Sequence, residues 1–178
     1  YRLETALKTV AIIKKKIPYV KLLITGKLCW TGDAGEAKRI LDNLIRQLKI
    51  EENVELSGTY FQNEAPDIFR RAHILIHPKY NDPCPTVVIE AMACGLPVVY
   101  SCSGGVPELV GSDAGIGIDA ELNWERKVIP DPELLSQAIF KVNEKRKTFS
   151  EAARERAERL FDINIWIEKH RTVFQKNA

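Results

Sequence analysis

Short apolar runs alternate with segments of helical periodicity along this chain, and that alternation limits the possible folds more than any other feature. Residues 20–25 (VKLLIT) form a continuous apolar run that ends at Gly26, the pattern of a strand buried on both faces. Comparable runs predict strands at residues 54–56, 73–77, 97–100 and 115–119. Helical spacing predicts helices at residues 3–11, 35–48, 64–71, 85–94, 107–110, 133–146, 150–161 and 164–174. Strands that alternate with helices across short connections predict an α/β fold, a Rossmann-like, doubly wound parallel sheet with helices on both faces.

Composition adds broad limits. The 178 residues hold 26 Lys and Arg against 24 Asp and Glu, and a net charge of +2 disfavours a dedicated nucleic-acid binder, which is usually strongly basic. No apolar run is long enough for a membrane-spanning helix, and the first ten residues lack the layout of a signal peptide. The four cysteines form no C-x-x-C pair. We therefore expect one globular domain of a cytoplasmic protein, with reduced thiols and no metal site.

Glycine and proline concentrate in one part of the chain. Residues 78–117 contain six of the ten glycines and five of the nine prolines, but only five charged side chains. A segment so rich in turn-forming residues and so poor in charge indicates specific backbone conformations, and we take it as the candidate site region. In doubly wound sheets, ligands bind beyond the carboxyl ends of the strands. The loops that follow the first predicted strands are therefore expected to line one edge together, at residues 26–33, 58–63, 78–85 and 101–107.

The segment 78–95 (PKYNDPCPTVVIEAMACG) carries the strongest candidate residues. Pro85 suits the first turn of a helix, and Gly95 suits its C-terminal end. Main-chain N–H groups of Thr86 and Val87 at this helix start predict an anion site. Glu90 stands in an apolar helix that is expected to be buried nearly all round, where an unpartnered carboxylate is costly. Glu90 therefore pairs with a structural donor, points to solvent, or binds a ligand.

The histidines do not indicate a metal centre. His73 and His77 bracket a predicted strand and share one of its faces, but no further ligands of suitable type stand nearby in the sequence. We expect His77 to end the strand with a hydrogen bond.

Three linked motifs carry a resemblance that spans essentially the whole chain. Two acidic residues eight apart, Asp82 and Glu90, are followed by EAMACGLPVV at residues 90–99 and by GGVPE at residues 104–108. This order resembles that of retaining glycosyltransferases of sequence family 4, which have the two-domain GT-B architecture. The upstream pattern, with a glycine after VKLLIT, then VELSG, then an apolar strand that ends in His-Pro, is similar to the same family.

The resemblance implies a role for each residue of the segment. Glu90 would hold the ribose hydroxyls of a nucleotide-sugar, whose hydrogen bonds would repay the cost of burying an acid. Asp82 would lie near the donor sugar and its anomeric centre, although the family usually has Glu there, one methylene longer. Thr86 and Val87 would offer main-chain N–H groups to the diphosphate.

The base and the sugar would be held by neighbouring loops. In the family pattern, Gly58, Thr59 and Tyr60 would contact the base through the backbone, and Cys84 and Pro85 would belong to the donor-sugar loop. An aromatic residue at position 60 also fits a cover for a sheet edge. Gly104 and Gly105 likewise fit a tight turn without any ligand.

The resemblance also implies a domain organisation. Residues 1–178 would be the nucleotide-sugar-binding C-terminal domain, inactive alone. The first strand, an Arg/Lys pair for the phosphates and an N-terminal acceptor domain would lie upstream of Tyr1. We expect Trp166 to pack on this domain's own sheet and the stripe near Val173 to meet the other domain.

The implied function is transfer of a sugar from a nucleotide-diphosphate sugar to a hydroxyl acceptor, in polysaccharide, glycolipid or glycoconjugate synthesis. No metal or other cofactor and no nucleic acid is expected, and peripheral membrane association of the intact protein is compatible with the sequence. The alternatives are another GT-B enzyme, such as an epimerase or a glycogen-type synthase, and a non-catalytic nucleotide-binding or interaction module. The base (UDP, GDP or ADP), the sugar, the acceptor and the oligomeric state are left open.

Overall fold

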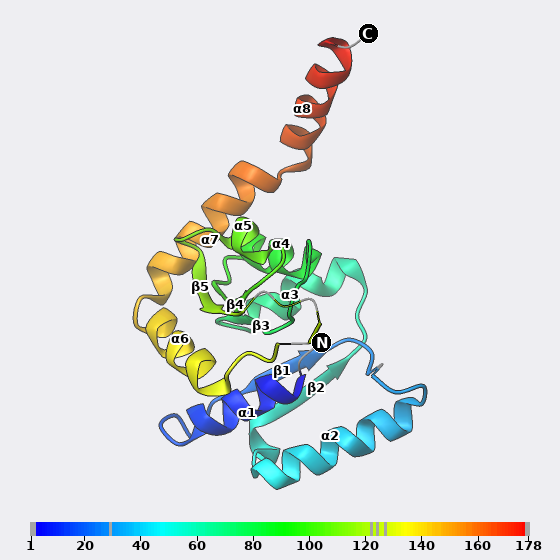
Figure 1. Ribbon diagram of the computed structural model, residues 1–178, viewed down its shortest axis with the longest axis vertical. Coiled ribbons are helices and arrows are strands. Elements are labelled where there is room, and N and C mark those ends of the chain that lie inside the picture. The colour runs from blue at the N-terminus through cyan, green and yellow to red at the C-terminus, as the bar shows by residue number, and fades with distance from the viewer. Residues whose placement is uncertain (1–2, 29, 122, 124, 127, 177–178) are drawn as a thin grey trace.

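The computed structural model describes residues 3–28, 30–121, 123, 125–126 and 128–176 (Figure 1). Strands and helices alternate through the first two thirds of the chain, and three helices follow. The strands are β1 (Leu22–Thr25), β2 (Val54–Gly58), β3 (Leu75–His77), β4 (Val98–Cys102) and β5 (Gly115–Asp119). The α-helices are α1 (Leu3–Lys14), α2 (Ala34–Leu48), α3 (Ala65–Arg70), α4 (Thr86–Ala93), α5 (Val106–Val110), α6 (Pro132–Glu144), α7 (Arg146–Phe161) and α8 (Ile163–Lys176).

The strands pair in parallel throughout, which confirms the predicted α/β class. They form two ladders rather than one sheet: β1 pairs with β2, and β4 lies between β3 and β5. Within the described residues, no ladder joins β1 to β3. Apolar packing connects the two ladders instead, because Ile76 of β3 packs against the core cluster built from α1, β1 and α2.

Two main cores stabilise the fold. One lies between α1, β1 and α2 and includes Leu7, Leu41 and Ile50, all essentially inaccessible to solvent. The other lies where α4, α5 and α7 cover β4, and Val88 and Met92 are fully buried there. A smaller cluster packs α6 against β4 and β5. Helices therefore cover both faces of the β3–β4–β5 ladder, as the doubly wound pattern requires.

Helix α4 has the boundaries that the sequence predicts to within one residue. Pro85 occupies the N-cap position with an extended backbone, and its carbonyl accepts from the Val88 N–H at 3.0 Å. Gly95, with a φ of 78°, follows the helix and donates to the carbonyl of Met92. A left-handed residue directly after a helix suits glycine, since any other residue would strain its Cβ there.

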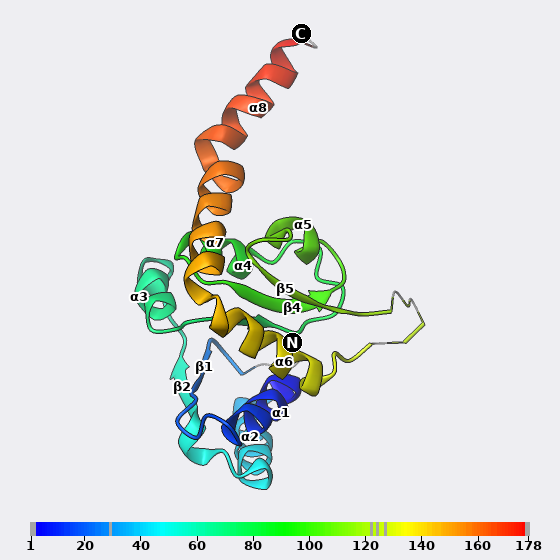
Figure 2. The same ribbon diagram turned by 90° about the vertical axis from the view of Figure 1, so that its left-hand side faces the viewer.

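Helix α8 projects away from the rest of the molecule (Figure 2). The prediction that Trp166 packs on the domain's own sheet is wrong: Trp166 is 54% exposed, and its ring stacks on that of His170, with 3.7 Å between the ring centroids. The apolar positions of α8 at helical spacing are exposed, namely Ile163, Trp166, Ile167, Val173 and Phe174. Among the described residues, no helix combines the length and apolar character needed to span a bilayer.

Candidate functional site

The loops at the carboxyl ends of the strands meet in pairs, as the parallel arrangement predicts. The Gly26 N–H after β1 donates to the carbonyl of Gly58 at the end of β2, at 2.7 Å. The loop after β3 lies along the loop after β4, where Asp82 and Gly104 form a parallel bridge and the Gly105 N–H donates to the Asp82 carbonyl at 2.9 Å. The loop that carries Asp82 and the glycine-rich motif are thereby brought together.

Glycine is required at both positions of this contact. A Cβ on Gly104 would stand 2.3 Å from the carbonyl oxygen of Asp82, and a Cβ on Gly105 would stand 2.0 Å from that of Pro83. Gly104 also has a φ of 66°, in the left-handed region. The glycine pair therefore does more than form a tight turn, because the absence of side chains lets the backbone of the 78–85 loop lie directly against Gly104 and Gly105.

The carboxylate of Asp82 is buried and shared between two basic side chains. Its Oδ2 lies 3.1 Å from Nζ of Lys79 and 3.2 Å from Nε2 of His77, and only 7% of the residue is exposed. Within the described residues no hydrogen bond to Oδ1 is found. The aspartate is thus held within its own loop by one of its oxygens.

The environment of His77 corrects one prediction. The ring Nε2 is buried and close to Asp82, but its geometry falls short of a hydrogen bond, so His77 does not end β3 with one. Burial lowers the pKa of His77 from its usual value, and this outweighs the neighbouring carboxylate of Asp82, which raises it. The ring is therefore neutral at neutral pH, and the positive charge that faces Asp82 is that of Lys79.

A short polar network fixes the backbone next to Asp82. The N–H of Asn81, whose φ is 54°, donates to Oγ of Ser103 at 2.8 Å. Ser103 is buried, and its hydroxyl lies 3.0 Å from that of Ser101, which is also buried. These contacts support a left-handed residue that would otherwise cost free energy.

The start of α4 has the free donors that the sequence predicts. Neither Thr86 nor Val87 donates its main-chain N–H to another group within the part of the chain that the structure describes. Thr86 is exposed and Val87 is half-buried. Two adjacent N–H groups at a helix N-terminus attract an anion through their dipoles and through the helix dipole.

Glu90 lies one turn further along α4, and its surroundings differ from the expectation of a helix buried all round. Glu90 is half-buried, whereas Val88 and Ala91 of the same helix are fully buried. In the described structure, no ion pair or hydrogen bond engages its side chain. The interpretation that Glu90 pairs with a structural donor is therefore wrong, and its carboxylate is accessible to a ligand.

The predicted base loop follows β2. Gly58 has a φ of 73°, Thr59 is exposed, and Tyr60 packs half-buried against the small apolar cluster between α3 and α4. Tyr60 thus contributes to the apolar packing between α3 and α4. Of the two sugar-loop candidates, Cys84 is exposed and Pro85 is buried.

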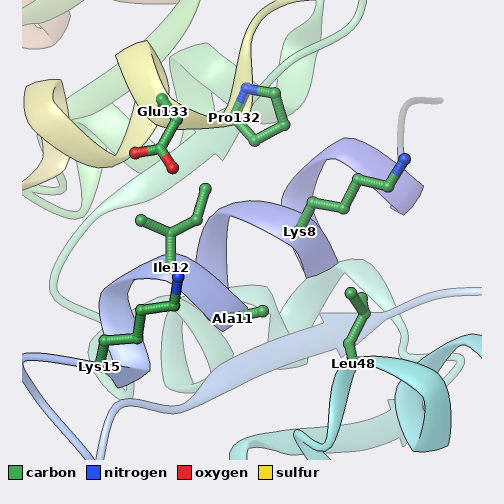
Figure 3. Close-up of a pocket in the computed structure, with 7 residues that line it drawn as sticks. All are labelled: Lys8, Ala11, Ile12, Lys15, Leu48, Pro132 and Glu133. Carbon is green, nitrogen blue, oxygen red and sulfur yellow. The ribbon is translucent and has the colours of Figure 1, made fainter.

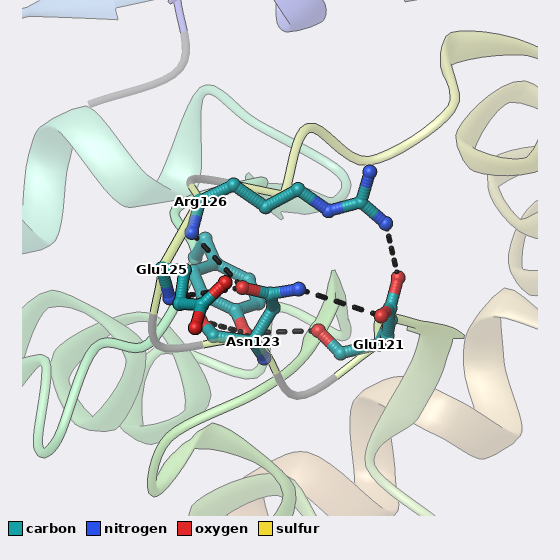
Figure 4. A network of polar contacts seen from close by, with 5 residues as sticks. Glu121, Asn123, Glu125 and Arg126 are labelled. Carbon is teal, nitrogen blue, oxygen red and sulfur yellow. Dashed lines mark hydrogen bonds and ion pairs between the residues drawn. The ribbon is translucent and has the colours of Figure 1, made fainter.

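Sequence reasoning missed a hydrogen-bonded tether in the same region. The Tyr80 hydroxyl lies 2.9 Å from the carbonyl oxygen of Glu121 and 3.2 Å from that of Asn123, and it accepts from the Asn123 N–H at 2.7 Å. The segment beyond β5 is further linked by an Arg126–Glu121 ion pair and by N–H groups donated to the Asn123 side chain (Figure 4). No pattern in the sequence pairs residues 43 positions apart.

Two surface pockets lie away from the predicted donor-site residues. One, of about 300 Å³, lies between α1 and α6 and is lined by Lys8, Ala11, Ile12, Lys15, Leu48, Pro132 and Glu133 (Figure 3). The other, of about 860 Å³, lies between α3, the end of α4 and α7. Neither contains a predicted donor-site residue. No group of three or more potential metal ligands gathers among the described residues.

Comparison with known proteins bears on the function of this edge. Residues 1–156 match the family model described as Glycosyl transferases group 1. An uncharacterized glycosyltransferase of Haemophilus influenzae is 33% identical over 138 residues, which cover 74% of this chain and 36% of that protein. The phosphatidylinositol N-acetylglucosaminyltransferase gpi3 subunit of Schizosaccharomyces pombe is 30% identical over 95 residues, 53% of this chain and 19% of that protein. The chain thus spans well under half of these relatives.

Solved structures agree on the fold. Sucrose-phosphate synthase from Thermosynechococcus elongatus matches with a TM-score of 0.75 and 25% identity, over 96% of this chain and 41% of that one. HepE from Anabaena, solved in complex with UDP and glucose, matches with a TM-score of 0.75 and 21% identity, over 94% of this chain and 44% of that one. The C-terminal domain of LpcC from Francisella tularensis matches over 90% of this chain and 80% of that structure, with a TM-score of 0.72 and 16% identity.

Proposed function

Because the chain belongs to the family described as Glycosyl transferases group 1, we propose that its carboxyl edge binds a nucleotide-diphosphate sugar and delivers the sugar to a hydroxyl acceptor. We further propose that it is a family 4 enzyme of the retaining type, which acts in polysaccharide, glycolipid or glycoconjugate synthesis. The same proposal assigns the protein to the cytoplasm and requires no metal.

One observation carries the proposal. The carboxylate of Glu90 is half-buried and accessible, one helical turn beyond the free N–H groups of Thr86 and Val87. A diphosphate needs main-chain donors or cations, and a ribose needs an acceptor for its hydroxyl groups. The start of α4 offers both kinds of group on a single rigid element, so a nucleotide fits with its phosphates at the helix start and its ribose at Glu90.

The test is calorimetry with UDP, GDP and ADP on the wild-type chain and on Glu90→Gln. We expect one nucleotide to bind and the substitution to weaken it about tenfold or more, because hydrogen bonds to a charged acceptor are lost. Glu144→Gln, at an exposed glutamate that ends α6, is the matched control and should bind like the wild type. Wild-type protein that binds none of the three, or Glu90→Gln that binds as tightly as the control, would refute the assignment.

We also propose that the chain is the donor-binding half of a two-domain GT-B enzyme and needs its other half for turnover. The interrupted sheet supports this, because a parallel strand placed between β1 and β3 would join both ladders into one sheet. The exposed apolar stripe of α8 offers a surface for the other half. In a longer protein that extends upstream of Tyr1, the amides of β1 and β3 should exchange more slowly than the same amides in a protein of residues 1–178 alone. Equal exchange would contradict the added strand.

The alternative enzymes differ in what they consume. An epimerase would convert or release its nucleotide-sugar without an acceptor, whereas a transferase would need one for efficient turnover. A non-catalytic module would bind nucleotide but would not consume the nucleotide-sugar, with or without an acceptor. Donor consumption in the intact protein, measured with and without a hydroxyl acceptor, separates the three.

A further inference from the structure

The loop between β3 and α4 contains a charge pair that the donor site as proposed so far does not use. Lys79 and Asp82 form it, with 3.1 Å between Nζ and Oδ2. Asp82 is held in place independently by the parallel bridge to Gly104 and by the hydrogen bond from Gly105. An anchored carboxylate fixes the position of an ammonium group that would otherwise move on a flexible four-carbon stem.

Lys79 is the charged partner of the Asp82 carboxylate. Asp82 is almost wholly buried, and a buried carboxylate needs a charged partner. His77 is the other group in contact, but its ring is neutral at neutral pH because burial lowers its pKa. Lys79 therefore supplies the compensating charge, and about a third of its side chain (36%) still reaches solvent.

The pair lies in the loop that leads into the anion site at the start of α4. Four peptide units separate Asp82 from Thr86, which bounds the distance between their Cα atoms at about 14 Å for an extended chain. The loop ends in the N-cap of α4, so Lys79 and the free N–H groups of Thr86 and Val87 belong to one continuous segment, which is anchored at Asp82 by the Gly105 N–H.

We propose that Lys79 is a donor-binding residue that contacts the diphosphate of the nucleotide-sugar, and that Asp82 is the positioning residue that holds it there. This inference rests on the proposed function. It changes the role implied for Asp82, whose Oδ2 is directed to Lys79 rather than to a sugar hydroxyl. The diphosphate would then be held by two main-chain N–H groups and one ammonium group, which are charge-assisted donors of the kind that phosphates require.

The experiment compares a nucleoside diphosphate with its nucleoside. Calorimetry is performed on the whole chain with whichever of UDP, GDP and ADP binds, and with the corresponding nucleoside. Lys79→Met should weaken diphosphate binding about tenfold and leave nucleoside binding unchanged. Lys79→Arg should restore most of the loss, and the affinity of Lys79→Met should fall less steeply with added salt than that of the wild type.

Controls separate this role from a structural one. Lys38→Met removes a comparable Lys–Asp pair, with 2.7 Å between Lys38 and Asp42 on the surface of α2, and should bind like the wild type. Asp82→Asn should weaken diphosphate binding, and the double variant should be no weaker than Lys79→Met, since both changes remove one interaction. Unchanged diphosphate binding by Lys79→Met, or an equal loss for nucleoside and diphosphate, overturns the inference while the proposed function stands. Wild-type protein that binds no nucleotide overturns both.

Discussion

Gly104 lies against the backbone of Asp82 so closely that a single added methyl group would stand 2.3 Å from the Asp82 carbonyl oxygen. Through this contact, the glycine-rich turn after β4 determines where the loop after β3 lies. The loop carries Lys79 and Asp82 and leads directly into the start of α4. A glycine 14 residues beyond Glu90 thus contributes to the geometry of the proposed donor site without any polar side chain of its own.

We expect Gly104→Ala to destabilise the protein by about 2–5 kcal/mol, because it combines a left-handed backbone with a backbone clash. Urea unfolding measures the change in the free energy of unfolding. Gly32→Ala is the matched control, since a Cβ there meets nothing within 4 Å, and it should stay within about 0.5 kcal/mol. Similar losses for both variants would show that the approach of the two loops is not tight.

Tyr80→Phe removes one oxygen atom and with it the tether to Glu121 and Asn123. The expected cost is about 1–2 kcal/mol, because the Asn123 N–H loses its acceptor in a partly buried position. Hydrogen exchange should report faster exchange at the amide of Asn123 with little change in β4. Tyr19→Phe, at a tyrosine that is 81% exposed, serves as the control and should alter neither quantity. Unchanged exchange at Asn123 would contradict the tether.

Acid should weaken the fold through His77. Its pKa is lower in the folded protein than in the unfolded chain, since burial disfavours the charged ring. The unfolded state therefore binds the proton more readily, and stability that is present above a pH of about 6.5 is lost as the pH falls through the folded pKa.

Unfolding measured from pH 7.5 to 5.5 checks this linkage. The free energy of unfolding should fall with pH in the wild type and fall less in His77→Gln. His170→Gln, on the exposed helix α8, is the control and should keep the slope of the wild type. A slope in His77→Gln that equals the wild-type slope would exclude His77 as the source.

The apolar stripe of α8 should contribute little to the stability of this chain. Phe174 is 71% exposed, so Phe174→Gln should change the free energy of unfolding by about 0.5 kcal/mol or less. Met92→Ala, in the core between α4 and β4, provides the contrast and should cost about 2–5 kcal/mol because it leaves a cavity. A large loss for Phe174→Gln would mean that α8 packs on this domain after all.

The alternation of strands and helices could be predicted from local periodicity, because each buried strand and each amphipathic helix records its environment in its own residues. The boundaries of α4 followed from Pro85 and Gly95 for the same reason. The free N–H groups of Thr86 and Val87 followed from helix geometry alone. The motif order added a resemblance to glycosyltransferases, and the match of residues 1–156 to the family described as Glycosyl transferases group 1 confirms that broader membership.

Errors arose where a residue's surroundings come from distant segments. The apolar stripe that contains Trp166 predicts a buried side chain, yet periodicity cannot say whether a partner element is present. The apolar residues around Glu90 predict a deeply buried side chain. Which side of α4 faces solvent, however, depends on where β3 and α3 lie around the helix.

The sequence by itself determined the class of fold, the order of its elements and the segment of the candidate site, since these depend on interactions between neighbours in the chain. Only the tertiary structure decided that the strands form two ladders, that Asp82 is shared by His77 and Lys79, and that Tyr80 holds Glu121 and Asn123. Those relationships join loops that meet only after parallel strands have aligned their carboxyl ends. No local pattern encodes which side chains such a meeting brings within hydrogen-bonding distance.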